Sequence, residues 1–154
     1  MLAARMSTSV SVVSTLSGMS TFSAQNIRSA MSPAQLPISA RACTTAAVIP
    51  CADFSADKAT NYDAIAFGCP AMGAEVLEEM EFQPMFDACK NCLGGKAVAL
   101  FGSYGWGDGE WMRSWEKDCD DVGINLVCES VICTETPDDA ALEACRALGK
   151  ALAE

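Results

Sequence analysis

Two runs of mostly apolar residues, at positions 62–68 and 96–102, constrain the fold of this chain more than any other feature. Each run ends in glycine, and neither shows the strict alternation of apolar and polar residues that marks a strand with one wet face. Strands covered on both faces belong to parallel sheets with helices on either side. We therefore expect an α/β protein built on a parallel sheet.

Further segments extend this pattern along the chain. We expect strands near residues 9–14, 44–49, 62–68, 96–102 and 124–133. We expect helices at about residues 18–31, 75–92, 109–122 and 138–153. This alternation is typical of successive βαβ units. The length of 154 residues suits one domain, which we place at residues 9–154 after an N-terminal extension at 1–8.

The start of the last expected helix carries several helix-start signals. Thr136 can cap the helix, and Pro137 suits its first position. Asp138 and Asp139 then favour the positive end of the helix dipole. Trp111 and Trp115, four residues apart on an expected helix, are interpreted as core residues.

The charge is acidic and unevenly placed. The net charge is −10, and residues 61–154 hold eighteen acidic against six basic residues. Such a surface disfavours nucleic acid, whose phosphates require Lys and Arg, and favours partners with basic docking surfaces. No apolar run approaches the ~20 residues of a membrane span. We also expect a cytoplasmic protein, because the cysteines are typical of reduced thiols, and a monomer.

Nine cysteines and no histidine restrict the chemistry. The absence of histidine excludes Ser–His and Cys–His catalysis and histidine-ligated metals. Cys89 and Cys92 have the spacing of a redox pair but fall within an expected helix and lack a second pair. We favour ordinary reduced thiols for them and expect no metal site, while the redox alternative stays open.

Three loops that follow expected strands carry unusual residues, and the carboxyl ends of parallel strands meet at one edge of a sheet. The first, at 15–20, places hydroxyls and a glycine at an expected helix start. The backbone N–H groups there could bind an anion, or the hydroxyls could simply cap the helix. The second, at 68–75, offers Met72 as an apolar wall and Glu75 as a hydrogen-bond acceptor. Alternatively, Met72 fills a gap in the core and Glu75 favours a helix N-terminus. The third, at 102–109, is rich in glycine and centred on Trp106. Together they predict a site for a flat, phosphorylated heteroaromatic ligand.

Two of these loops resemble a known family. The stretches Gly68-Cys69-Pro70-Ala71-Met72-Gly73 and Phe101-Gly102-Ser103-Tyr104-Gly105-Trp106-Gly107 are similar to those of the short-chain flavodoxins of the clostridial and Megasphaera type. The resemblance implies a three-layer, doubly wound flavodoxin-like fold with a five-stranded parallel sheet in the order 2-1-3-4-5. It also implies non-covalently bound FMN and a low-potential one-electron carrier, not an enzyme, that shuttles between semiquinone and hydroquinone and docks on redox partner proteins such as reductases.

The resemblance assigns roles to residues of this chain. The implied cofactor-binding set is Thr15, Leu16, Ser17, Gly18, Met19, Ser20, Pro70, Ala71, Met72, Gly73, Ala74, Glu75, Ser103, Tyr104, Gly105, Trp106 and Gly107. Residues 15–20 would hold the phosphate, Trp106 and Met72 would cover the two ring faces, and Glu75 would accept from the ring N3–H. The N–H groups of Gly105 and Trp106 would bind the O2 side.

One peptide in the second loop is expected to switch. By the resemblance, the peptide between Gly73 and Ala74 turns its carbonyl toward the flavin N5–H in the semiquinone. If these residues are the central pair of a two-residue turn, one orientation puts positive φ on Gly73 and the other on Ala74, where it costs alanine ~1 kcal/mol or more. Two alternatives from other classes remain open: a non-redox interaction protein on this scaffold, and an FMN-dependent quinone or NAD(P)H oxidoreductase.

Overall fold

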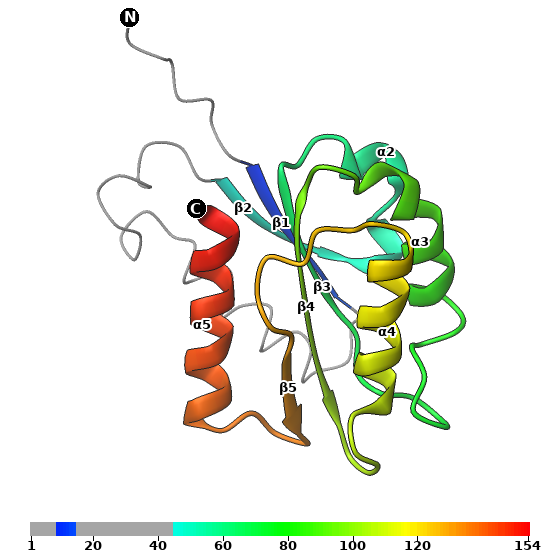
Figure 1. Ribbon diagram of the computed structural model, residues 1–154, viewed down its shortest axis with the longest axis vertical. Helices are drawn as coiled ribbons and strands as arrows, with labels where there is room; N and C mark the ends of the chain where they lie inside the picture. Colours follow the sequence, from blue (N-terminus) through cyan, green and yellow to red (C-terminus); the bar gives the residue numbers. More distant parts are fainter. Residues whose placement is uncertain (1–8, 15–44) are drawn as a thin grey trace, which may run out of the picture.

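The computed structural model describes residues 9–14 and 45–154, whose strands form one parallel sheet (Figure 1). The strands are β1 (Ser9–Ser14), β2 (Thr45–Pro50), β3 (Ala64–Gly68), β4 (Ala97–Tyr104) and β5 (Val131–Thr134). Their order is β2-β1-β3-β4-β5, and every pair of neighbours is parallel. The expected fold class and strand order are thereby confirmed.

Helices cover both faces of this sheet. The described helices are η1 (Cys51–Asp53), α2 (Ala56–Ala59), α3 (Phe82–Cys89), η2 (Lys90–Cys92), α4 (Glu110–Asp121) and α5 (Asp139–Ala153). Figure 1 shows α2, α3 and α4 on one face of the sheet and α5 on the other. The expected three layers are present. The helix expected at 18–31 and the extension at 1–8 lie outside the described residues.

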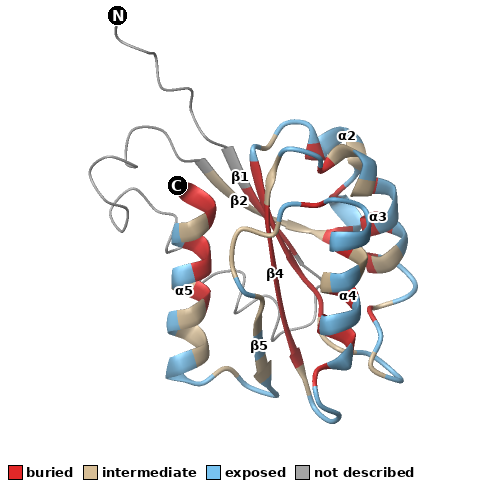
Figure 2. Ribbon diagram, in the orientation of Figure 1, coloured by how far each residue is buried: buried red, intermediate tan, exposed pale blue. Residues whose placement is uncertain are grey.

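Apolar side chains fill the space on each side of the sheet. Strands β3 and β4 are buried almost throughout, as Figure 2 shows. On the α3 and α4 side, Phe67, Phe86 and Trp115 meet edge to face, with ring centroids 5.2 and 5.4 Å apart. Trp111 and Trp115 are only 1% and 2% exposed, which confirms their predicted place in the core.

The helix expected at 75–92 begins later than predicted, because α3 starts only at Phe82. Pro84 is its third residue. Proline is tolerated in a first helical turn, but an earlier start would press its ring against the carbonyl four residues upstream. The residues before Phe82 form turns instead, and these turns belong to the candidate site.

The last expected strand, at 124–133, is interrupted. Only Val131–Thr134 form β5, and upstream a single parallel bridge joins Leu126 to Val98. Val98 pairs with Leu126, and Phe101 pairs with Val131. Strand β4 advances three positions between these two pairs, whereas the last segment advances five. Since the two extra residues have no partner in the ladder, the pairing breaks between the bridge and β5.

Two shorter features also differ from the expectation. Asp138, not Thr136, caps α5: its carboxylate accepts from the Ala141 N–H at 2.8 Å, and Pro137 precedes the cap instead of opening the helix. Helix α2, which was not expected, begins after Ser55, whose hydroxyl accepts from the Lys58 N–H at 3.4 Å. At four residues, α2 is too short to show a helical period in the sequence.

The sequence also predicted that the cysteines are reduced thiols and that no segment is apolar enough to span a membrane. The eight described cysteines are all free thiols, and Cys89 and Cys92 are the last residues of α3 and η2. Among the described helices, none combines the length and apolar character that crossing a membrane requires.

Candidate functional site

The loops that follow β3 and β4 are joined at the carboxyl edge of the sheet. The N–H of Cys69 donates to the Phe101 carbonyl at 3.1 Å, and the N–H of Ala71 donates to the Ser103 carbonyl at 2.8 Å. A Cβ on Gly102 would lie 2.2 Å from the Cys69 carbonyl oxygen, so only glycine permits this approach. Two of the three loops singled out in the sequence therefore form one rigid edge.

The loop after β3 folds back on itself. Met72 and Val76 form an antiparallel bridge, with N–H to carbonyl distances of 2.8 and 3.0 Å. Three residues lie between them, so the two-residue turn assumed for Gly73 and Ala74 is wrong. Positive φ falls on Gly73, at 48°, and on Glu75, at 53°, and Ala74 is outside that region.

Glu78 and Cys69 secure the far end of this loop. The Glu78 carboxylate accepts from the N–H groups of Met80, Glu81 and Phe82, each at 2.8 Å, and so caps the start of α3. These bonds, led by the one from Phe82, lower the pKa of Glu78. The Glu78 N–H donates to the Cys69 sulfur at 3.3 Å, and burial raises the pKa of that thiol to about 12. Cys69 is thus a buried packing group.

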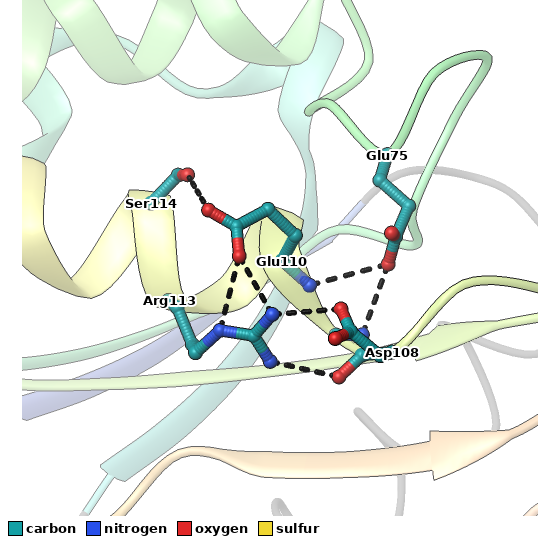
Figure 3. Close-up of polar contacts among 6 residues, drawn as sticks. Glu75, Asp108, Glu110, Arg113 and Ser114 are labelled. Atoms are coloured by element: carbon teal, nitrogen blue, oxygen red, sulfur yellow. Dashed lines mark hydrogen bonds and ion pairs between the residues drawn. The ribbon is translucent and has the colours of Figure 1, made fainter.

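Glu75 links this loop to the start of α4. Its Oε1 accepts from the N–H of Gly109 at 2.9 Å and from that of Glu110 at 3.2 Å (Figure 3). Gly109 precedes α4 and has no side chain to cap it, so the carboxylate satisfies two N–H groups at this helix terminus. Sequence reasoning linked Glu75 to its own expected helix. The helix it caps begins 35 residues further on, which no local pattern could indicate.

Among the predicted site residues, two large apolar side chains stand exposed on these joined loops. Met72 is 44% exposed and Trp106 is 61% exposed. Their neighbours of the predicted set lie inward: Ser103 is buried, and the Tyr104 ring packs against Trp111 with centroids 5.2 Å apart. Of the predicted site residues, the Met72 thioether and the Trp106 indole are therefore the apolar groups that remain exposed at this edge.

The site also offers polar groups of both kinds. Within the described part of the chain, the N–H groups of Gly105 and Trp106 have no hydrogen-bond acceptor. Glu75 Oε2 likewise accepts no hydrogen bond from residues 9–14 or 45–154. Two apolar walls, free donors and a free acceptor match the two faces and the polar edge of a flat heteroaromatic ring.

Comparison with known proteins decides the family. The chain matches no family-level sequence model. It is 45% identical to a flavodoxin of Clostridium beijerinckii over 101 residues, which cover 66% of this chain and 72% of that protein. It is 42% identical to a flavodoxin of Megasphaera elsdenii over 102 residues, again 66% of this chain and 72% of the relative. This chain belongs to the flavodoxin family.

Solved flavodoxin structures agree with this assignment. The two-electron reduced Megasphaera elsdenii flavodoxin superposes with a TM-score of 0.77 at 36% identity, covering 94% of this chain and 98% of that one. Flavodoxin 1 of Bacillus cereus gives a TM-score of 0.74 at 23% identity, covering 95% and 97%, and shows the shared fold. As a flavodoxin, the chain is an FMN-binding electron carrier and not a conventional enzyme.

The structure brings together most of the predicted set but not all of it. Met72, Glu75 and Trp106 come from two loops that touch, as expected. The six residues of the expected phosphate loop, 15–20, lie outside the described residues. What is described fits the ring of FMN, by the chemistry of its walls and of its donors and acceptors.

Proposed function

We propose that the FMN ring lies between the loops after β3 and β4. Trp106 covers one ring face and Met72 covers the other. Glu75 accepts from the ring N3–H through its free Oε2, while the N–H groups of Gly105 and Trp106 donate to the O2 side. The expected loop at 15–20 holds the phosphate through its hydroxyls and N–H groups.

The observation that carries this proposal is the exposure of Met72 and Trp106, 44% and 61%, on loops that are hydrogen-bonded to each other. Large apolar side chains on a surface are informative when they stand together beside convergent polar groups. Here the polar groups, Glu75 among them, are backbone N–H donors and a carboxylate, which is the pattern an isoalloxazine edge requires.

When bound, FMN supplies the one-electron chemistry. The chain's own residues hold the ring, exclude water from its two faces and surround it with charge. Glu75, Asp108 and Glu110 place carboxylates close to the ring pocket, and Arg113 is the cation among them. An excess of negative charge disfavours adding a further negative charge to the ring, so we propose that the second reduction occurs at low potential.

The direct test is a titration of the apoprotein with FMN, followed by spectroelectrochemical reduction. We expect one FMN per chain and flavin fluorescence that is quenched on binding by Trp106. Trp106→Leu should bind more weakly and lose most of the quenching. Val122→Ala, which trims another exposed apolar residue at the far end of α4, is the control and should change neither. Undiminished quenching in Trp106→Leu would place the ring elsewhere.

We further propose that this edge is where redox partners with basic surfaces dock. The exposed apolar side chains Met72, Val76, Met80 and Trp106 lie on the two loops, beside the acidic residues 78, 79, 81 and 108. Complementary charge accelerates such encounters and loses its effect as salt is added. Electron transfer to a small basic haem protein should therefore slow with rising ionic strength, and an unchanged rate would oppose this assignment.

We place the protein in the cytoplasm as a monomer, working by transfer between partner proteins. The alternative of an oxidoreductase that turns over a small quinone or NAD(P)H predicts steady-state activity without a partner reductase. The carrier predicts none. Nothing in the described site or among its relatives favours that alternative, and an assay with and without a partner reductase separates the two.

A further inference from the structure

The loop at 105–109, which carries Trp106, has a backbone that needs restraint. Three of its five residues are glycine, and Gly107 and Gly109 have φ of 87° and 89°. Glycine loses more conformational freedom on ordering than any other residue. A loop of this composition would therefore weaken ligand binding if the ligand had to order it.

Arg113 contacts this loop at several points (Figure 3). Its Nη1 donates to the Asp108 carbonyl at 2.8 Å, and its Nη2 contacts the Asp108 carboxylate at 2.7 Å. Its Nε and Nη2 reach Glu110 Oε2 at 3.1 and 2.6 Å. One planar guanidinium thus joins a loop carbonyl, a loop carboxylate and the first residue of α4.

Arg113 forms an i,i+3 ion pair with Glu110 within α4, but its other contacts are not explained by the stability of that helix. It is the fourth residue of that helix, near the end where the helix dipole disfavours a cation. Its contacts with Asp108 lead away from the helix and into the loop. Glu75 holds the N–H groups at the loop's end from the opposite side, so the two residues restrain the loop from two directions.

We propose that Arg113 is a positioning residue: it holds the 105–109 loop in the conformation that receives the flavin ring. This inference rests on the proposed site. A residue that pre-orders the ring pocket should change the affinity for the ring, with or without a phosphate attached. A residue that acts only through its charge should change the affinity for a phosphorylated ligand and leave that for a neutral one.

The experiment compares Arg113→Met, Arg113→Lys and Arg146→Met. The Met variant keeps much of the aliphatic stem and loses all donors, while the Lys variant keeps the charge but not the planar fork. Arg146 on α5 has an ion pair of the same i,i+3 kind with Glu143, at 3.0 Å, and serves as the matched control. Dissociation constants are measured for FMN and for riboflavin, which lacks the phosphate.

We expect Arg113→Met to weaken both ligands by the same factor, about fivefold. Arg113→Lys should fall between this variant and the wild type, and Arg146→Met should match the wild type. In the apoprotein, amide hydrogen exchange across residues 105–110 should be faster in Arg113→Met, while the urea midpoint shows that the variant is folded.

These measurements distinguish a failure of the proposed function from a failure of the positioning role of Arg113. If the wild type binds neither FMN nor riboflavin, the proposed function fails. If the wild type binds and Arg113→Met weakens FMN alone, Arg113 acts through its charge and the positioning role is overturned. Unchanged exchange at 105–110 in the apoprotein overturns it independently of any ligand, including the case in which riboflavin binds too weakly to measure.

Discussion

The Glu75 carboxylate occupies the space that a side chain on Gly107 would need. An ideal Cβ on Gly107 would lie 2.1 Å from the Glu75 carboxyl carbon, and Gly107 has a φ of 87°. The glycine in the loop after β4 is therefore needed for two reasons, its left-handed backbone and the acidic residue that crosses from the loop after β3. Through this contact the two loops act as one structural unit.

Gly107→Ala should lower the free energy of unfolding of the apoprotein by more than the backbone strain of placing alanine at a left-handed position. Gly95 is the matched control, since it has a φ of 80° and nothing lies within 4 Å of its would-be Cβ. Gly95→Ala should cost about 1–2 kcal/mol from backbone strain. Gly107→Ala should cost about 1 kcal/mol more, because Glu75 loses its bonds to the α4 N–H groups. Urea unfolding gives both values.

A double mutant isolates the contribution of this contact. In a Glu75→Ala background no carboxylate remains to be displaced, so the cost of Gly107→Ala should fall to that of Gly95→Ala. An undiminished cost would mean that the contact with Glu75 contributes nothing and that backbone strain explains the whole effect.

Glu78 should make the stability of the protein depend on acidic pH. The N–H groups at the start of α3 lower its pKa in the folded state below the ordinary value of 4.5. Its stabilisation is therefore fully present above the pKa of the unfolded chain and is lost as the pH falls through the folded value. Glu78→Gln should have a lower urea midpoint than the wild type at pH 7, and the difference should shrink toward pH 3.

The neighbouring Glu79, an exposed residue of the same loop, is the control for this measurement. Glu79→Gln changes the net charge by the same amount and should leave the pH dependence parallel to that of the wild type. Equal behaviour of the two variants would show that the Glu78 bonds to Phe82 and its neighbours contribute nothing that depends on charge.

The sequence predicted the sheet and the glycine-rich loop that carries Trp106 because these depend on local patterns. The runs at 62–68 and 96–102 contain the buried strands β3 and β4, and Trp106 lies in the loop that the glycines indicated between β4 and α4. A buried strand and a glycine-rich loop can be predicted from local composition and spacing alone.

The rest depends on contacts between distant residues or on register. Glu75 caps a helix that begins at residue 110, and Leu126 is offset from Val131 by two residues relative to β4. Neither relation leaves a periodic signal. Pro84 was a readable signal for the late start of α3, since proline is confined to the first turn of a helix.

Glu75→Gln should raise the second one-electron potential of the FMN-loaded protein. The change removes one negative charge beside the proposed ring site but retains an oxygen that can accept from the Gly109 N–H. We expect a rise on the order of 1 kcal/mol, or roughly 40 mV for one electron. Glu143→Gln, on α5 at the opposite face of the sheet, removes the same charge and should leave the potential unchanged. A lower or unchanged value in Glu75→Gln would oppose the assigned role.

Ala74→Gly should reduce the amount of the one-electron-reduced form during a reductive titration. In the structure Gly73 has positive φ, at 48°, and Ala74 does not. The opposite orientation of the peptide between them would place positive φ on residue 74, which costs alanine ~1 kcal/mol or more and costs glycine little. Alanine at this position therefore favours the orientation seen in the structure, and we propose that this orientation presents the Gly73 carbonyl to the ring.

Replacing Ala74 by glycine removes that preference, and a change of ~1 kcal/mol corresponds to about a fivefold change in the equilibrium between the orientations. The two one-electron potentials should move closer together, while the urea midpoint of the apoprotein changes little. Gly123→Ala introduces strain at a φ of 74° in open space, and as a control it should lower stability without moving either potential. Equal separation of the potentials in Ala74→Gly and the wild type would show that residue 74 does not govern the orientation of this peptide.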